Sequence, residues 1–170
     1  TFCYQSHAWN TEIKTLEDSA LEHTPTGINN SGYTWTDLYG EGISGILSER
    51  GQAWYYKQNL GRGHFSPARL IKEKPSFAGL DTGLVQFQDL EGSGEKQLVN
   101  WASTPKGYFN FKEGAQWENL QTFDTVPNRN LVNDPNTRFI DLDGDGRPDL
   151  LITEHDLFCW HSSQGKKDPL

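Results

Sequence analysis

A six-residue pattern, Asp-Leu-x-Gly-x-Gly, occurs three times in this chain of 170 residues. The copies begin at Asp37, Asp89 and Asp141, so neighbouring copies stand 52 residues apart. Four fixed positions that recur at one spacing predict a chain built from copies of one supersecondary unit. An aromatic residue precedes each aspartate by two positions, and an apolar pair follows each copy. The aromatic residues are Trp35, Phe87 and Phe139, and the apolar pairs are Ile46-Leu47, Leu98-Val99 and Leu150-Leu151.

Each copy of the pattern lies between segments typical of β-strands. Alternating polar and apolar residues lead into the pattern, as in residues 84–89, and the glycines permit the positive φ of a tight turn. An apolar strand and an aromatic strand follow, and in the first two units a further segment, such as residues 64–71, closes the unit. About four antiparallel strands in a period near 50 residues match a β-propeller blade. The sequence therefore predicts an all-β fold of blade-like repeats.

The repeat also divides the chain. We expect a lead-in segment, or the end of a preceding blade, in residues 1–30. Blade-like repeats follow in 31–82 and 83–134, and a partial third repeat in 135–170 ends before its last strand. Two blades and part of a third cannot close a ring, and open sheet edges invite mispairing. We therefore expect a segment of a larger propeller, or a chain that assembles with copies of itself.

The charge balance narrows the range of partners. A net charge of −8 and a pI near 5.0 argue against nucleic acid or an anionic membrane surface, because both need clustered lysine and arginine. The sequence has no run of 18 apolar residues, and its first ten residues do not resemble a signal peptide. The absence of methionine indicates a processed product or an excised piece. Cys3 and Cys159 either pair or remain buried free thiols.

The third copy of the pattern concentrates carboxylates. Positions one, three, five and nine of this loop are Asp141, Asp143, Asp145 and Asp149. Alternate carboxylates followed by one at the ninth position can surround a hard cation such as Ca²⁺ with oxygen ligands. The carbonyl of Arg147 can supply the seventh-position ligand. The sequence therefore predicts a Ca²⁺ site here, whose ion would hold the loop rather than catalyse.

The predicted metal site can be compared with an EF-hand and with the first two loops of this chain. An EF-hand is excluded, because position twelve is Ile152 rather than glutamate and the flanking residues predict strands. The alternative to a metal site is a turn in which aspartates accept hydrogen bonds from nearby backbone N–H groups. The first two loops favour this alternative, because they hold poorer ligands at the same positions. Those positions are Asp37, Tyr39, Glu41 and Gly45 in the first loop, and Asp89, Glu91, Ser93 and Gln97 in the second.

The sequence offers no constellation of catalytic residues. Residues 40–45 match the dinucleotide-binding fingerprint, but that fingerprint opens a helix, whereas this match is one copy of the strand-turn repeat. No serine stands in a G-x-S-x-G motif, and the five histidines show no zinc-binding spacing. We therefore expect that the protein is not an enzyme.

The tryptophans suggest a possible contact surface. Trp35, Trp54 and Trp160 fall within repeat strands, so we expect them to pack between blades. Trp101 and Trp117 lie near turns, so we expect them to be exposed. Exposed aromatic rings can stack on a sugar or anchor a protein interface.

Three segments carry a resemblance to a known family. They are GYTWTDLYGEGISGIL at 32–47, AWYYKQNLG at 53–61 and FIDLDGDGRPDLL at 139–151. With these segments, the chain over about residues 30–165 resembles the middle or N-terminal region of the TcB component of bacterial insecticidal toxin complexes. The same region occurs in SpvB-type virulence proteins. The third segment is less specific, because FG-GAP and VCBS repeats of adhesins and integrin-like propellers share it.

The resemblance implies a role, a location and partners. In that family the region contributes to a β-propeller that docks TcB onto the TcA translocation channel. TcB and TcC form a hollow shell around the toxic enzyme, and the propeller is the gate for the unfolded payload. For this chain the resemblance implies a secreted, non-catalytic segment with TcA-like and TcC-like partners and no insertion into a membrane. The alternative is a carbohydrate-binding or adhesive propeller module with glycans as partners.

Overall fold

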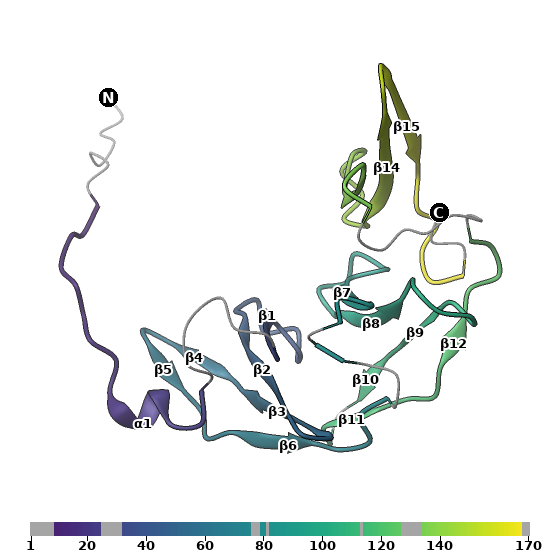
Figure 1. The fold of residues 1–170 in the computed structure, drawn as a ribbon. Helices are drawn as coiled ribbons and strands as arrows, with labels where there is room; N and C mark the ends of the chain where they lie inside the picture. Colours follow the sequence, from purple (N-terminus) through teal and green to yellow (C-terminus); the bar gives the residue numbers. More distant parts are fainter. Residues whose placement is uncertain are drawn as a thin grey trace.

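Three antiparallel sheets of three or four strands follow one another along the chain in an open arc (Figure 1). The computed structural model describes residues 9–24, 32–75, 79–80, 82–112, 114–126 and 134–167. The all-β prediction is confirmed, because the helical part of these residues is one short helix, α1 (Asp18–Leu21). Over the same ranges the sheets close into neither a barrel nor a propeller ring. None of the described helices is long and apolar enough to cross a membrane.

The first two sheets share one strand order. The first contains, in spatial order, β1 (Tyr33–Thr36), β2 (Gly45–Arg50), β3 (Ala53–Lys57) and β6 (Arg69–Ile71). The second contains β7 (Val85–Gln88), β8 (Gln97–Asn100), β9 (Gly107–Phe109) and β12 (Gln121–Thr122). The third contains β13 (Thr137–Ile140), β14 (Asp149–Glu154) and β15 (Leu157–His161). Two small hairpins complete the fold: β4 (Asn59–Gly61) with β5 (His64–Phe65), and β10 (Phe111–Lys112) with β11 (Gln116–Trp117).

The strand register repeats with the sequence. In each sheet the aromatic residue before the aspartate pairs with the first residue of the apolar pair. The pairs are Trp35 with Ile46, Phe87 with Leu98, and Phe139 with Leu150. A slip of one residue would turn every apolar side chain to the opposite face of its sheet. The constant register therefore gives each of the three loops the same length and the same position relative to its sheet.

Two apolar cores lie between consecutive sheets. The first core joins buried residues of the first sheet to Leu98, Phe109 and Trp117 of the next repeat. Its aromatic rings include Trp54 and Trp117, whose centroids are 6.1 Å apart. The second core includes Trp101, which stacks on Phe123 and on Phe139 at 4.9 and 5.2 Å.

The expected exposure of the tryptophans is partly wrong. Trp54 is buried as expected, but Trp101 and Trp117 are buried as well, while Trp35 and Trp160 are half exposed. Trp101 directly follows β8 and Trp117 ends β11, and both rings point into the apolar cores between sheets, Trp117 into the first and Trp101 into the second. Cys159 is an exposed free cysteine on β15, which contradicts the expectation of a buried thiol, and Cys3 lies outside the described residues.

The leucine at the second position of the first two loops packs on the following sheet. Leu38 belongs to the first core and Leu90 to the second, with exposed fractions of 4% and 1%. Leu142 occupies the same position in the third loop and is 43% exposed. The sheets therefore form a series in which each repeat covers the apolar face of the one before it.

This packing predicts that replacing the loop leucine by alanine lowers the free energy of unfolding more in the second loop than in the third. Leu90→Ala is expected to lower the free energy of unfolding by about 2–5 kcal/mol, because it leaves a cavity in the second core. Leu142→Ala removes the same atoms from an exposed position and is expected to cost less than about 1 kcal/mol. Urea unfolding of both variants measures the difference, and equal losses would contradict the packing order.

Candidate functional site

The first aspartate of each loop accepts a backbone hydrogen bond from the glycine at position six. The N–H groups of Gly42, Gly94 and Gly146 donate to the carboxylates of Asp37, Asp89 and Asp141, with N···O distances of 2.6, 2.5 and 3.0 Å. All three glycines have positive φ, between 81° and 88°, a region that side chains with a Cβ rarely adopt. We call this bond the Asp–Gly latch. It forms the aspartate turn that was the alternative to a metal site.

A side-chain oxygen also binds the N–H of the loop leucine in each repeat. Gln97 Oε1 accepts from Leu90 N at 2.9 Å, and Asp149 Oδ2 accepts from Leu142 N at 3.0 Å. Gln97 and Asp149 both stand at position nine of their loops, so this position has a structural role. From the sequence, Gln97 was expected only to be a poor metal ligand, and this structural role was not predicted. The available signal was an oxygen-bearing side chain at position nine in two of the three loops.

The first loop achieves the same bond in another way. Position nine is Gly45, and the hydroxyl of Tyr56 accepts from Leu38 N at 3.4 Å while donating to Thr36 O at 3.2 Å. A Cβ at Gly45 would collide with that hydroxyl. Burial raises the pKa of Tyr56, and the nearby Asp37 carboxylate raises it further. Hydrogen bonds between the Tyr56 hydroxyl and the backbone lower the pKa by less, so the hydroxyl stays protonated.

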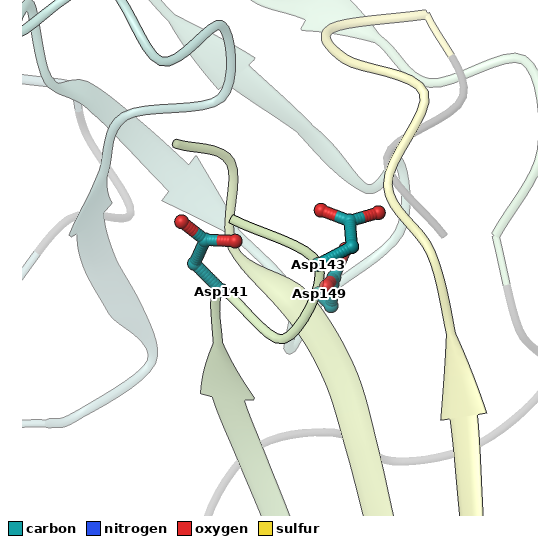
Figure 2. A group of neighbouring side chains, drawn as sticks. All are labelled: Asp141, Asp143 and Asp149. Carbon is teal, nitrogen blue, oxygen red and sulfur yellow. The ribbon is translucent and has the colours of Figure 1, made fainter. Parts of the chain in front are cut away.

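Three of the predicted metal ligands lie together in the third loop. Asp141, Asp143 and Asp149 each offer a carboxylate oxygen, and these oxygens lie within 4.8 Å of one another (Figure 2). Ca²⁺ binds oxygens at about 2.3–2.6 Å, so two ligands of one ion are separated by at most about 5 Å. The three carboxylates therefore fit a hard cation. They supply fewer than the six to eight oxygens that Ca²⁺ takes, and water or backbone carbonyls would supply the others.

The other two predicted ligands are arranged differently. Asp145 Oδ1 accepts from the N–H of Arg147 at 2.8 Å, and its Oδ2 lies 3.5 Å from the Arg147 guanidinium. Asp145 is thus paired with a cation and lies outside the group of three carboxylates. Ligation by Asp145 and by the Arg147 carbonyl stays a prediction.

Asp149 is the one fully buried carboxylate of the group. Burial alone would raise its pKa, but hydrogen bonds from the backbone N–H groups of Ser163 and Leu142 outweigh this effect, so the pKa lies below its usual value. The Ser163 N–H lies 2.9 Å from Asp149 Oδ1. Asp149 therefore stays ionised and links the loop, β14 and the segment after β15.

Consecutive loops touch through their glycines. A Cβ at Gly92, position four of the second loop, would lie 3.1 Å from the carbonyl oxygen of Asp145 and 3.3 Å from the carbonyl carbon of Gly146. The same positions meet between the first two loops, where a Cβ at Gly40 would lie 3.7 Å from the Gly94 carbonyl oxygen. The glycines at positions four and six thus let neighbouring loops stack.

A groove of about 630 Å³ runs beside the loops. Its walls come from the first strands of all three sheets, β1, β7 and β13, and include Trp35, Phe87 and Phe139. Charged residues at the loop end of the strands also line it: Asp89, Lys96, Asp141 and Arg147. The groove is thus an aromatic surface with charges at one end.

The chain matches no protein-family model and no curated protein. Solved structures with a similar fold include two proteins from different organisms. A Photorhabdus luminescens Tc holotoxin pore is 20% identical with a TM-score of 0.67, over 84% of this chain and 7% of that chain. An Agrocybe aegerita lectin that recognises non-reducing terminal N-acetylglucosamine is 17% identical with a TM-score of 0.56, over 85% of this chain and 38% of that chain. The chain therefore spans less than half of either protein, and at these identities the likeness concerns the fold alone.

The stacking of the loops predicts a difference between two glycines at position four. Gly92→Ala places a methyl group against the third loop at a positive φ, and we expect it to cost about 2–4 kcal/mol of unfolding free energy. Gly144→Ala is the matched control, because its φ is also positive and nothing lies within 4 Å of the new Cβ. It is expected to cost about 1–2 kcal/mol, from backbone strain alone. Urea midpoints at low protein concentration measure both, and a Gly144→Ala loss as large as that of Gly92→Ala would refute the stacking.

The lowered pKa of Asp149 predicts a pH-dependent loss of stability. The ionised carboxylate stabilises the fold above the unfolded-state pKa of about 3.9, and this contribution disappears as the pH falls through the lower folded-state value. Asp149→Asn is expected to cost about 1–3 kcal/mol at pH 7. The gap between wild type and variant should narrow below about pH 4. Thermal unfolding from pH 7 to pH 2 measures this gap, and a constant gap would show that the charge of Asp149 does not contribute.

Proposed function

We propose that this chain is a non-catalytic β-propeller segment of a secreted bacterial toxin-complex subunit. In this role it docks the subunit onto a TcA-like translocation channel and contributes to the gate through which the toxin passes. The observation that supports the proposal best is the fold likeness to the Tc holotoxin pore, which extends over most of this chain. TcA-like and TcC-like subunits are the proposed partners, and the proposal assigns no reaction to the chain.

The arrangement of the sheets supports the propeller part of the proposal. Each sheet presents the same register, each loop carries the same latch, and the first and second repeats each pack an apolar face on the next repeat. A propeller is a radial series of such four-stranded units. The order of the sheets along an open arc is compatible with consecutive blades (Figure 1).

A metal ion in the third loop would stabilise this architecture. Asp141, Asp143 and Asp149 would hold Ca²⁺ beside the contact between the second and third loops. The ion would offset the repulsion among three neighbouring carboxylates and so strengthen the turn. We propose this structural role for the metal and no catalytic one.

A carbohydrate-binding module is the second candidate. Two observations favour it: the fold likeness to the Agrocybe aegerita lectin, and the aromatic groove with its half-exposed Trp35. The groove replaces the surface that the sequence suggested, because Trp101 and Trp117 are buried and cannot contact a sugar. Trp35 is thus the residue on which glycan binding would depend.

One binding experiment separates the two candidates. The immobilised chain is exposed in parallel to a TcA-type channel subunit and to glycans ending in N-acetylglucosamine. We expect binding of the TcA-type subunit with a dissociation constant of about 1 μM or below. No glycan binding is expected, with or without Trp35→Ala. Glycan binding that Trp35→Ala abolishes, together with no binding of the channel subunit, would overturn the toxin-complex proposal in favour of the lectin.

The proposed metal site predicts a thermal shift. Ca²⁺ that binds only the folded state raises the free energy of unfolding by about 2.7 kcal/mol when its concentration is a hundred times the dissociation constant. This corresponds to a rise in Tm of roughly 5–10 °C. Asp143→Asn should abolish the rise and leave the loop folded, because Asp143 is exposed and the hydrogen bonds that its carboxylate accepts from Asp145 N–H and the Ser162 hydroxyl are long, at 3.2 and 3.3 Å.

A second variant tests the fourth carboxylate. Asp145→Ala removes the rise in Tm if Asp145 turns from Arg147 to the ion, and preserves it if three carboxylates suffice. An unchanged Tm of the wild-type chain in Ca²⁺ would refute the metal site.

A further inference from the structure

The loop end of the groove brings together two cationic side chains from different repeats. Lys96 belongs to the second loop and Arg147 to the third, and both are half-buried and line the groove. In the part of the chain that the structure describes, the ammonium of Lys96 has no hydrogen-bond or ion-pair partner. The lining residues of the groove all fall between residues 34 and 148, so the groove is built away from both ends of the sequence.

The guanidinium of Arg147 is paired on one side only. Its Nη1 atom lies 3.5 Å from Asp145 Oδ2. Its Nε atom is buried and has no hydrogen-bond partner among the described residues. The Nε–H group of an arginine and a neighbouring terminal N–H form a planar fork that matches the two oxygens of a carboxylate. Arg147 therefore retains an edge that can bind a carboxylate.

A third polar group of the groove also has no partner. Thr36 lines the groove and is 1% exposed, and its hydroxyl makes no hydrogen bond within the described ranges. The matching residue of the second repeat is Gln88, whose side chain is bonded to Trp101 and Gln86 at 3.0 and 3.1 Å. A buried polar group without a partner is costly. A ligand hydroxyl seated in the groove can supply that partner.

The two carboxylates that line the groove are already compensated. Asp89 accepts hydrogen bonds from three backbone N–H groups of its own loop, and Asp141 accepts from two. These donors stabilise both negative charges where they stand. Lys96 and the Nε edge of Arg147 have no such partners. The unsatisfied groups at this end of the groove are therefore donors, and an anionic group complements them.

The remaining wall of the groove suits a sugar ring. Trp35 is 51% exposed, and Phe139 lines the groove from the third sheet. Aromatic rings of this kind can stack on the apolar face of a sugar. The amide of Gln86 also lines the groove and offers hydrogen bonds to hydroxyl groups. The volume of about 630 Å³ is typical of a small-ligand site.

We propose that the groove binds a sugar that carries a carboxylate, such as a uronic acid. The carboxylate occupies the loop end and accepts hydrogen bonds from the Arg147 fork and from Lys96, while the ring lies against Trp35. This ligand goes beyond both candidate functions, because neither a docking partner nor a neutral glycan explains the unpaired donors of the groove. The binding test with a TcA-type subunit is decided independently of it.

Titration of the ¹⁵N-labelled chain with glucuronate, followed by NMR, tests the proposal. EDTA is present, so that no Ca²⁺ ion bridges the sugar to the third loop. Glucose has the same ring without the carboxylate, and acetate has the carboxylate without the ring. We expect a dissociation constant of about 1 mM for glucuronate, at least about tenfold weaker binding of glucose and of acetate, and a shift of the Arg147 Nε–H signal with glucuronate.

Matched variants separate the two cations from net charge. Lys96→Gln removes one charge, and Arg147→Lys keeps the charge but loses the planar fork, so each should weaken glucuronate binding at least about fivefold. Lys72→Gln removes an exposed lysine outside the groove and should leave the affinity unchanged. If Arg147→Lys lowers the urea midpoint, the shift of the Arg147 Nε–H signal in the wild-type chain decides instead.

Four results would overturn the proposal. They are no glucuronate binding at about 20 mM, glucose or acetate binding as tightly as glucuronate, an Arg147 Nε–H signal that glucuronate does not move, and equal losses of affinity in Lys72→Gln and Lys96→Gln.

Discussion

The fold depends on one hydrogen bond that the chain makes three times, from the N–H of a positive-φ glycine to the aspartate five residues before it. This bond closes each loop at a fixed length and so fixes the register between the first and second strands of each sheet. The register decides which side chains face the next repeat. The two apolar cores and the stacking of the loops follow from that choice.

The same constraint explains why the third loop is both a turn and a candidate metal site. Asp141 forms the latch, and Asp149 occupies the position that Gln97 holds in the second loop, so both have structural roles before any ion is considered. Their carboxylates retain free lone pairs, and Asp143 adds a third oxygen nearby. The scaffold common to all loops therefore brings the carboxylates together, and a metal ion would strengthen a turn that already exists.

The sequence was informative where the structure is local. The repeat, the strands on either side of each loop and the aspartate turn follow from spacing and residue type. Packing between sheets does not follow from spacing and residue type. A tryptophan near a turn gives the same sequence pattern whether it is exposed or, like Trp101, stacked between two aromatic rings. The hydroxyl of Tyr56 in place of a side chain at Gly45 also depends on a contact between distant residues. The exposure of Leu142 depends on what covers the third sheet, which the motif of the third loop does not encode.

The most direct test of a latch common to three loops is amide hydrogen exchange at Gly42, Gly94 and Gly146. These loops lie at the surface, where an amide without a partner exchanges at nearly the rate of an unfolded chain. We predict that all three glycine amides are protected by at least about tenfold and that Asp89→Ala removes the protection of Gly94. Exchange of these amides at the unfolded-chain rate in the wild-type protein would show that the three loops are not closed by this hydrogen bond.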